Sequence, residues 1–229
     1  SGKPFDLAWC EFWFGLLFIP KGDGENAVKH FQNSARFFEQ IQMMFFLAAA
    51  FGGLAYGYYF VGDLKNARKQ AERAIEIHTD AGINRWLGTP YLALGMVHLD
   101  SGDLKNARSC IEHTLNLALK TGEKVSELEA RILLGRILGK ADPSQGAKAE
   151  EYILQGIKII EELKVKPYLA EGYLSLGELY IDLGQEEKAV EILKKAQGMF
   201  REMGMDYWLK RIREVMAKLK PRRSRRKSG

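Results

Sequence analysis

Few side chains in this sequence could do chemistry, and they are scattered along it. The four histidines are His30, His78, His98 and His113. Their spacing contains no metal-ligand pattern. Two acidic pairs, Glu150-Glu151 and Glu186-Glu187, fall where helices are expected to begin, and the helix dipole favours negative charge there. No nucleophile elbow, phosphate-binding loop or zinc-protease motif occurs. The sequence therefore predicts a protein that is not an enzyme, with no catalytic residue, no metal site and no cofactor.

The two cysteines, Cys10 and Cys110, are too few for a disulfide framework. Both lie in apolar stretches with helical character, so we expect each to be a small buried hydrophobe. This cysteine usage is typical of a reducing compartment, and we expect the protein to be cytoplasmic.

The net charge of +5 is concentrated at one end of the chain. Residues 220–229 (KPRRSRRKSG) hold six basic side chains and no acid, which leaves a body of charge 5 − 6 = −1. We expect this segment to be a basic, disordered tail that is solubilising or that touches phosphates or an acidic surface weakly. Beyond such weak contacts, the sequence does not predict a nucleic-acid partner.

One uncharged segment, Ile41–Gly62, is long enough to raise the question of a membrane span. It contains Gly52, Gly53 and Gly57, and no cluster of basic residues marks a cytoplasmic flank. It also lies in register with an internal repeat, so we predict that it does not span a membrane.

The chain repeats itself. The heptapeptide GDLKNAR occurs at Gly62–Arg68 and again at Gly102–Arg108. Alignment on its alanine gives steps of 40, 40, 42 and 40 residues, at Ala27, Ala67, Ala107, Ala149 and Ala189. Upstream of each alanine stands a second small residue: Gly15, Ala55, Gly95, Gly135 and Gly177. This spacing predicts a helix, a tight turn and a second helix in every unit.

The residues of the turn have physical roles. Gly62, Gly102 and Gly184 would end the first helix, because glycine adopts the left-handed conformation at little cost. Asp63 and Asp103 would then cap the second helix. The small residues would let the two antiparallel helices cross closely.

The flanking residues resemble a known family. Tyr173-x-x-Leu176-Gly177-x-x-Tyr180, followed by Ala189-x-x-x-Leu193, is similar to the signature of the tetratricopeptide repeat. Residues 91–111 and 51–71 carry two further copies of it. The period of about 40 residues, longer than the usual 34, resembles the variety found in C-terminal arrays of bacterial signalling ATPases and nucleotide cyclases.

We therefore predict an all-α fold, a right-handed α-solenoid of five antiparallel helix hairpins with a C-terminal capping helix. Residues 1–219 would form a single domain, followed by the tail at 220–229. The hairpins are expected at about 5–44, 45–84, 85–124, 125–166 and 167–205, and the capping helix at about 206–219. An apolar stripe that includes Trp208, Ile212 and Val215 would cover the last hairpin.

The resemblance implies that the first helix of each hairpin lines a concave groove in which partners bind. Groove positions should be aromatic at the N-terminal end of the array and charged at the C-terminal end. The partner-binding candidates are Trp9, Phe12, Trp13, Leu16, Tyr56, Tyr59, Phe60, Met96 and Arg136.

These features predict a non-enzymatic protein–protein interaction scaffold that binds a protein or peptide in its groove. By the resemblance it would be a sensor or regulatory module of a larger cyclase- or ATPase-type signalling protein, binding a partner or its own parent chain. One alternative is a receptor whose curvature changes when a small apolar ligand or peptide binds. Another is a stand-alone, self-associating adaptor. The aromatic N-terminal end would bind a partner, or upstream repeats, another domain or a second copy of the chain would cover it.

Overall fold

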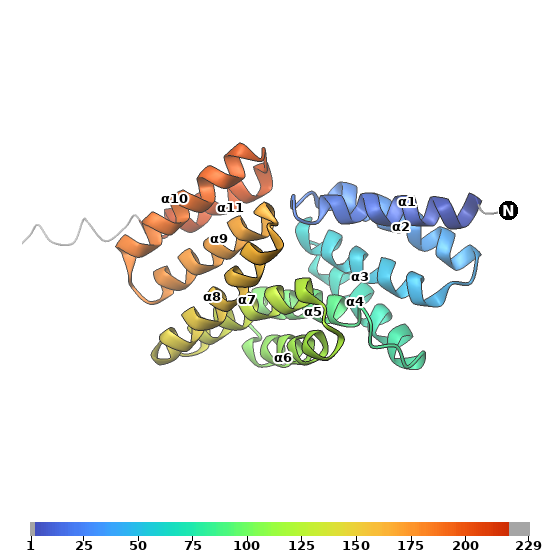
Figure 1. Cartoon of the computed structure of the whole chain (residues 1–229), viewed down its shortest axis with the longest axis horizontal. Helices are drawn as coiled ribbons and strands as arrows, with labels where there is room; N and C mark the ends of the chain where they lie inside the picture. Colours follow the sequence, from blue (N-terminus) through green and yellow to red (C-terminus); the bar gives the residue numbers. More distant parts are fainter. Residues whose placement is uncertain (1–2, 220–229) are drawn as a thin grey trace, which may run out of the picture. The chain divides into compact units, whose positions relative to one another are not determined.

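The computed structural model describes residues 3–219, and every regular element in that range is a helix (Figure 1). The all-α prediction is therefore confirmed. The chain divides into two compact units, Ser1–Leu133 and Leu134–Gly229. A single domain across residues 1–219 remains a proposal, and the tail at 220–229 lies outside the described residues.

The first unit is built from antiparallel helix hairpins. Its helices are α1 (Lys3–Phe18), α2 (Gly24–Gln40), α3 (Met44–Phe60), α4 (Leu64–Asp80), α5 (Gly88–Asp100), α6 (Leu104–Thr121) and the first part of α7 (Lys124–Ala141). Each of α1, α3 and α5 packs on the helix that follows it, and α2 and α4 also pack on the first helix of the next hairpin. Since α3 contacts both α1 and α5, the first helices form the inner layer of this unit.

The second unit follows the same plan. It contains the rest of α7, the short 3-10 turn η1 (Pro143–Gln145), α8 (Gly146–Leu163), α9 (Lys166–Asp182), α10 (Glu186–Glu202) and α11 (Asp206–Ala217). Helix α11 is the predicted capping helix. Its Ile212 and Val215 are buried, and the Trp208 ring stacks on Phe200 of α10 at a centroid distance of 5.6 Å.

The predicted close crossing is present inside the hairpins, and it has a partner that we had not identified. A Cβ atom on Gly95 would lie 2.4 Å from Ile111, the residue four positions after the repeat alanine. Gly15, Gly135 and Gly177 face Phe31, Ile153 and Leu193 in the same way. The second hairpin, whose small site is Ala55, carries Ala71 at the facing position. A large residue thus faces glycine and a small residue faces alanine, as a closely packed interior requires.

The turns also form as predicted. Gly62 and Gly102 have φ values of 81° and 79°, in the left-handed region. The Asp63 carboxylate accepts a hydrogen bond from the backbone N–H of Asn66 at 3.0 Å, and its other oxygen accepts one from the Asn66 side chain at 2.6 Å. Asp103 and Asn106 repeat this arrangement. Within GDLKN, the glycine ends the first helix and the Asp and Asn side chains form the cap of the second helix in both copies.

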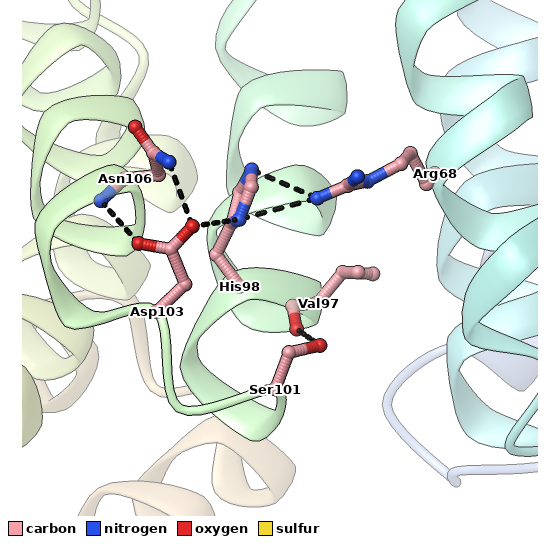
Figure 2. A network of polar contacts seen from close by, with 6 residues as sticks. All are labelled: Arg68, Val97, His98, Ser101, Asp103 and Asn106. Carbon is pink, nitrogen blue, oxygen red and sulfur yellow. Dashed lines mark hydrogen bonds and ion pairs between the residues drawn. The ribbon is translucent and has the colours of Figure 1, made fainter.

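The two heptapeptide copies are also linked through space (Figure 2). His98, near the end of α5, lies between Asp103 of the second copy and Arg68 of the first. Its Nδ1 is 3.2 Å from the Asp103 carboxylate, and Arg68 Nη2 is 3.3 Å from the same ring nitrogen. In the second unit Tyr180 and Glu150 take the positions of His98 and Arg68, and the Tyr180 hydroxyl donates to the Glu150 carboxylate at 2.6 Å. Arg68 and Glu150, each directly after a repeat alanine, thus make polar contacts with the next hairpin.

One histidine lies inside the apolar core. His78, in the last turn of α4, is 1% exposed, and neither ring nitrogen has a hydrogen-bond partner. Its ring meets Phe45 edge to face at 5.7 Å. The equivalent positions of the other hairpins are buried and apolar: Phe38, Ala118, Ile160 and Phe200. Burial lowers the pKa of His78, and the nearby Ile83 backbone opposes this only in part.

A double-mutant cycle tests whether the sizes of the two residues at the crossing depend on each other. Gly95→Ala should destabilise the protein because the new methyl group would meet Ile111, and Ile111→Ala should destabilise it by about 2–5 kcal/mol through loss of buried volume. The double variant reproduces the Ala55–Ala71 pair, so we expect it to lose less stability than the sum of the two, by roughly 0.5–3 kcal/mol. Urea unfolding gives the free energy of unfolding of the wild type, the two single variants and the double variant. Strictly additive losses would contradict a dependence between the two positions.

His78 should make the protein sensitive to mild acid. The unfolded chain binds a proton at this residue near its ordinary pKa of 6.5, whereas the folded chain resists it, so stability should fall as the pH drops below about 6.5. The slope from this residue is at most about 1.4 kcal/mol per pH unit. His78→Phe should remove that part of the slope, while His113→Gln on the exposed surface of α6 should leave it intact. Denaturant unfolding between pH 5 and 8 checks this, and an unchanged slope in His78→Phe would show that the residue does not contribute.

Candidate functional site

The structure distributes the predicted partner-binding residues between core and surface. Phe12 and Tyr56 are buried, with 7% and 5% exposure. Trp13 and Leu16 are exposed. Half-buried side chains make up the rest: Trp9, Tyr59, Phe60, Met96 and Arg136. All of these except Arg136 belong to the first unit. Phe12 and Tyr56 therefore pack against neighbouring aromatic rings and offer a partner little surface themselves.

A run of aromatic rings crosses the inner layer of the first unit, and we call it the aromatic ladder: Trp13, Trp9, Phe46, Trp86 and Phe45. The Trp9 ring stacks on Trp13 at 6.0 Å and meets Phe46 at 4.6 Å. Phe46 is 6.3 Å from Trp86, which stacks on Phe45 at 5.1 Å with an interplanar angle of 13°. Trp13 is exposed and the other four are half-buried. The ladder thus joins three successive hairpins through rings that keep part of their surface accessible.

Trp86 was missed as a site residue because its position depends on an unusual backbone. It has a φ of 63°, in the left-handed region that a bulky residue rarely adopts. Its N–H donates to the Glu123 side chain at 3.0 Å, and its ring also stacks on Phe12 at 6.2 Å. Helix α5 begins only at Gly88, so Trp86 lies in the connection before it. Such a conformation costs on the order of 1–3 kcal/mol and is concentrated at functional sites.

The carboxyl ends of α3 and α5 carry a second, more polar group of aromatic residues. The Tyr59 hydroxyl donates to Asp100 at 2.8 Å, and the Tyr59 ring meets Phe60 at 5.6 Å. Tyr56 hydrogen-bonds Glu129 of α7. Burial raises the pKa of Glu129 to about 8, and the Tyr56 contact opposes this shift only in part.

Helix α1 exposes apolar side chains on a further face. We call Leu7, Cys10, Trp13, Phe14 and Leu17 the outer face of α1. Their larger members are 47% (Leu7), 58% (Trp13), 52% (Phe14) and 60% (Leu17) exposed. Cys10 is exposed and Cys110 is half-buried, so the expectation that both are buried was wrong. The apolar residues around Cys10 form an exposed surface. Helical periodicity alone could not distinguish such a surface from a buried core.

In the second unit the inner layer is ionic. The Glu178 carboxylate is paired with Arg136 at 2.8 Å and with Arg211 of α11 at 2.9 Å. Burial by itself would raise the pKa of Glu178, but these two guanidinium groups, with Lys140 and Lys218, hold it below its usual value. Arg136 is therefore committed to a structural ion pair that connects α7, α9 and α11.

Within residues 3–219, no three His, Cys, Asp or Glu side chains come together in a group that could hold a metal ion. In the same range no helix combines the length and the apolarity that a bilayer crossing requires.

Two segments of the chain match family models described as tetratricopeptide repeat, at residues 46–120 and 170–202. The first covers the second and third hairpins, and the second covers most of α9 and α10. The chain therefore contains tetratricopeptide repeats in both of its units. No curated protein matches the sequence.

Solved structures share the fold at low sequence identity. Aspartyl phosphate phosphatase F from Bacillus subtilis is 18% identical with a TM-score of 0.61, over 94% of this chain and 59% of that one. A Rap protein complexed with competence and sporulation factor is 19% identical, with a TM-score of 0.70 over 90% of this chain and 57% of that one. The Rap conjugation gene regulator of plasmid pLS20, in complex with the Phr* peptide, is 17% identical, with a TM-score of 0.68 over 89% and 57%.

These neighbours confirm the predicted class of fold, an α-solenoid of the tetratricopeptide type. The chain spans less than two thirds of the length of each of the three proteins, so the likeness concerns the architecture alone.

The ion pairs of Glu178 predict a stability difference that depends on pH. Glu178→Gln should cost on the order of 3 kcal/mol at pH 7, because two partly buried guanidinium groups lose their counter-charge. The folded pKa of Glu178 is below its ordinary value of 4.5, so the stabilisation is present above about pH 4.5 and is lost as the pH falls toward the folded pKa. The difference in unfolding free energy between the wild type and Glu178→Gln should therefore be larger at pH 7 than at pH 3.

The matched control is Glu112→Gln, which breaks the exposed pair with Arg108. An exposed pair of this kind contributes about 0.2–1 kcal/mol. Equal losses in the two variants would contradict a structural role for the Glu178 pairs.

Proposed function

We propose that this chain is a non-enzymatic protein-binding scaffold that takes an apolar or aromatic peptide segment on the aromatic ladder of its first unit. Aromatic rings that are held rigidly and left partly accessible give a large contact area at a small cost in conformational entropy. The ladder offers such rings from α1, α3 and the connection before α5.

The observation that carries the proposal is the conformation of Trp86. Its left-handed backbone, the Glu123 hydrogen bond and the stacking on Phe12 and Phe45 hold a large ring on the inner layer. The fold could place a glycine there without strain. A strained tryptophan on a partly accessible surface favours a role in binding over one in packing.

The predicted groove residues take different parts in this proposal. Trp9 and Trp13 belong to the ladder, with Phe12 supporting it. Leu16, Tyr59, Phe60 and Met96 extend the candidate surface along the inner layer toward the other end of the first helices. Arg136 does not contribute to the ladder because it lies in the second unit and pairs with Glu178.

Two of the similar structures lend support, since one is a complex with competence and sporulation factor and the other a complex with the Phr* peptide. The proposal extends to the chain's setting. We propose that the scaffold is a sensor or regulatory module of a larger signalling protein of the cyclase or ATPase type, on the basis of its 40-residue period.

The proposal predicts that Trp86→Gly weakens peptide binding. A phage-displayed library of short random peptides is selected on the wild-type protein, and the enriched peptides are synthesised with a fluorescent label. Glycine adopts a φ of 63° freely, so the variant should fold while losing the ring. We expect Kd, measured by fluorescence anisotropy, to rise at least tenfold, about 1.4 kcal/mol.

Two control variants locate the loss. Leu119→Ala removes an exposed leucine of α6 and should change Kd less than twofold. Leu17→Asp changes the outer face of α1 and should also leave Kd intact, since Leu17 is not part of the ladder. Failure to enrich any apolar or aromatic peptide, or equal binding by Trp86→Gly and the wild type, would overturn the proposal.

A further inference from the structure

The outer face of α1 differs from the aromatic ladder in what surrounds it. Leu7, Cys10, Phe14 and Leu17 take no part in the ladder, and Trp13 lies at the edge between the two surfaces. Apart from Asp6 and Lys3, this side of the helix carries no charge. A row of apolar side chains about half exposed is unusual for a surface helix and is typical of a contact face.

The internal repeats show what the five positions do elsewhere in the chain. In α3 they are Leu47, Ala50, Gly53, Leu54 and Gly57, all buried. In the third hairpin they are Leu87, directly before α5, and Pro90, Ala93, Leu94 and Val97 of α5, of which only Leu94 is half-buried and the others are buried. In α9 they are Leu169, Gly172, Ser175, Leu176 and Leu179, of which only Leu169 is half-buried. In each of these three hairpins the chain therefore covers the face that α1 exposes.

The element that covers these positions is the second helix of the preceding hairpin. A Cβ on Gly53 would lie 2.4 Å from Phe31 of α2, and one on Gly57 would lie 2.8 Å from Val28 of α2. A Cβ on Gly172 would lie 2.9 Å from Ile157 of α8. The same interface thus forms in both units, between a second helix and the next first helix.

From this repeated interface we infer that the outer face of α1 is a stacking site for a further hairpin of the tetratricopeptide type, whose second helix lies along Leu7, Cys10, Phe14 and Leu17. The geometry also sets a condition on that helix. Phe31 fits over Gly53 because that site has no side chain, whereas the equivalent position in α1 is Trp13. The occupant must therefore carry a small residue against Trp13.

A second copy of the chain does not present such a helix. Stacking copies head to tail would require the last second helix, α10, to lie on α1 of the next copy. The face of α10 that would do so is covered by α11, whose Trp208 stacks on Phe200 and whose Ile212 and Val215 are buried. The occupant is instead a hairpin with an uncapped second helix.

The chain itself supplies a probe of the required chemistry. Helix α4 has Ala71 at the position where α2 has Phe31. A second copy of residues 45–84, inserted directly before Phe5 of the full chain, keeps the 40-residue step between repeat alanines and sets an alanine against Trp13. The inserted segment contains no cysteine, so the exposed Cys10 thiol reports whether the outer face is covered.

The experiment measures the reaction of Cys10 with Ellman's reagent in a Cys110→Ala background. We expect the extended protein to react at least tenfold more slowly than the original chain, and its Tm to rise by about 3 °C or more. The matched control carries Ala71→Phe together with Ala55→Gly in the inserted copy only, so that the phenylalanine fits its own hairpin as Phe31 fits against Gly15. Its phenylalanine would meet Trp13, and Cys10 should stay reactive.

Three outcomes would overturn the inference. The first is rapid reaction of Cys10 in the extended protein while circular dichroism shows that the added hairpin is helical. The second is equal protection of Cys10 by the Ala71→Phe control, which would remove the condition of a small residue against Trp13. The third is protection of Cys10 in the original chain as its concentration rises, with a dimer in sedimentation, which would identify a second copy as the occupant. Peptide binding to the ladder is tested separately through Trp86, which is not part of the outer face of α1.

Discussion

The close crossing of two helices at one small residue is the constraint on which the rest of this structure depends. A side chain four residues beyond the repeat alanine fills the space that the small residue leaves. Where the small site is Gly15, Gly95, Gly135 or Gly177, the filling residue is large, and where it is Ala55 it is another alanine. Helices at this distance gain dense van der Waals contact without strain. A large side chain faces glycine and a small one faces alanine, so the size of each residue of the pair depends on the other.

The filling residue also connects one hairpin to the next. Phe31 lies against Gly15 of its own hairpin and against Gly53 of the following one, and it is fully buried between them. A hairpin of this kind cannot bury its apolar surface alone, so stability is shared among neighbours. The two ends of such an array therefore need other solutions. At one end α11 covers α10 with Ile212 and Val215, whereas at the other the outer face of α1 is exposed.

The polar contacts follow the same division between local and long-range roles. Asp63 and Asp103 satisfy helix ends within a few residues of the chain. His98, through Arg68, and Tyr180, through Glu150, link neighbouring hairpins. Glu178 gathers two arginines from α7 and α11 around one partly buried carboxylate, which makes the inner layer of the second unit ionic. The first unit carries aromatic rings in the corresponding layer, so the chemistry available to a partner differs between the units.

The features formed within one hairpin could be predicted from the sequence. The 40-residue step located the hairpins, the Gly-Asp pairs located the turns and caps, and the capping helix followed from its apolar stripe. The order of aromatic and charged residue types along the first helices was also visible. These features depend on contacts within one hairpin, whose partners lie at fixed distances along the chain.

What only the tertiary structure decided is which side chains remain accessible. Phe12 and Tyr56 were expected to face a partner and are buried, while Cys10 was expected to be buried and is exposed. Trp86 could not be identified because its left-handed backbone depends on Glu123, 37 residues away. Helical periodicity assigns a residue to a side of its helix, but exposure depends on what the neighbouring hairpins place against that side. Those contacts are between elements far apart in sequence, and no spacing within a single repeat encodes them.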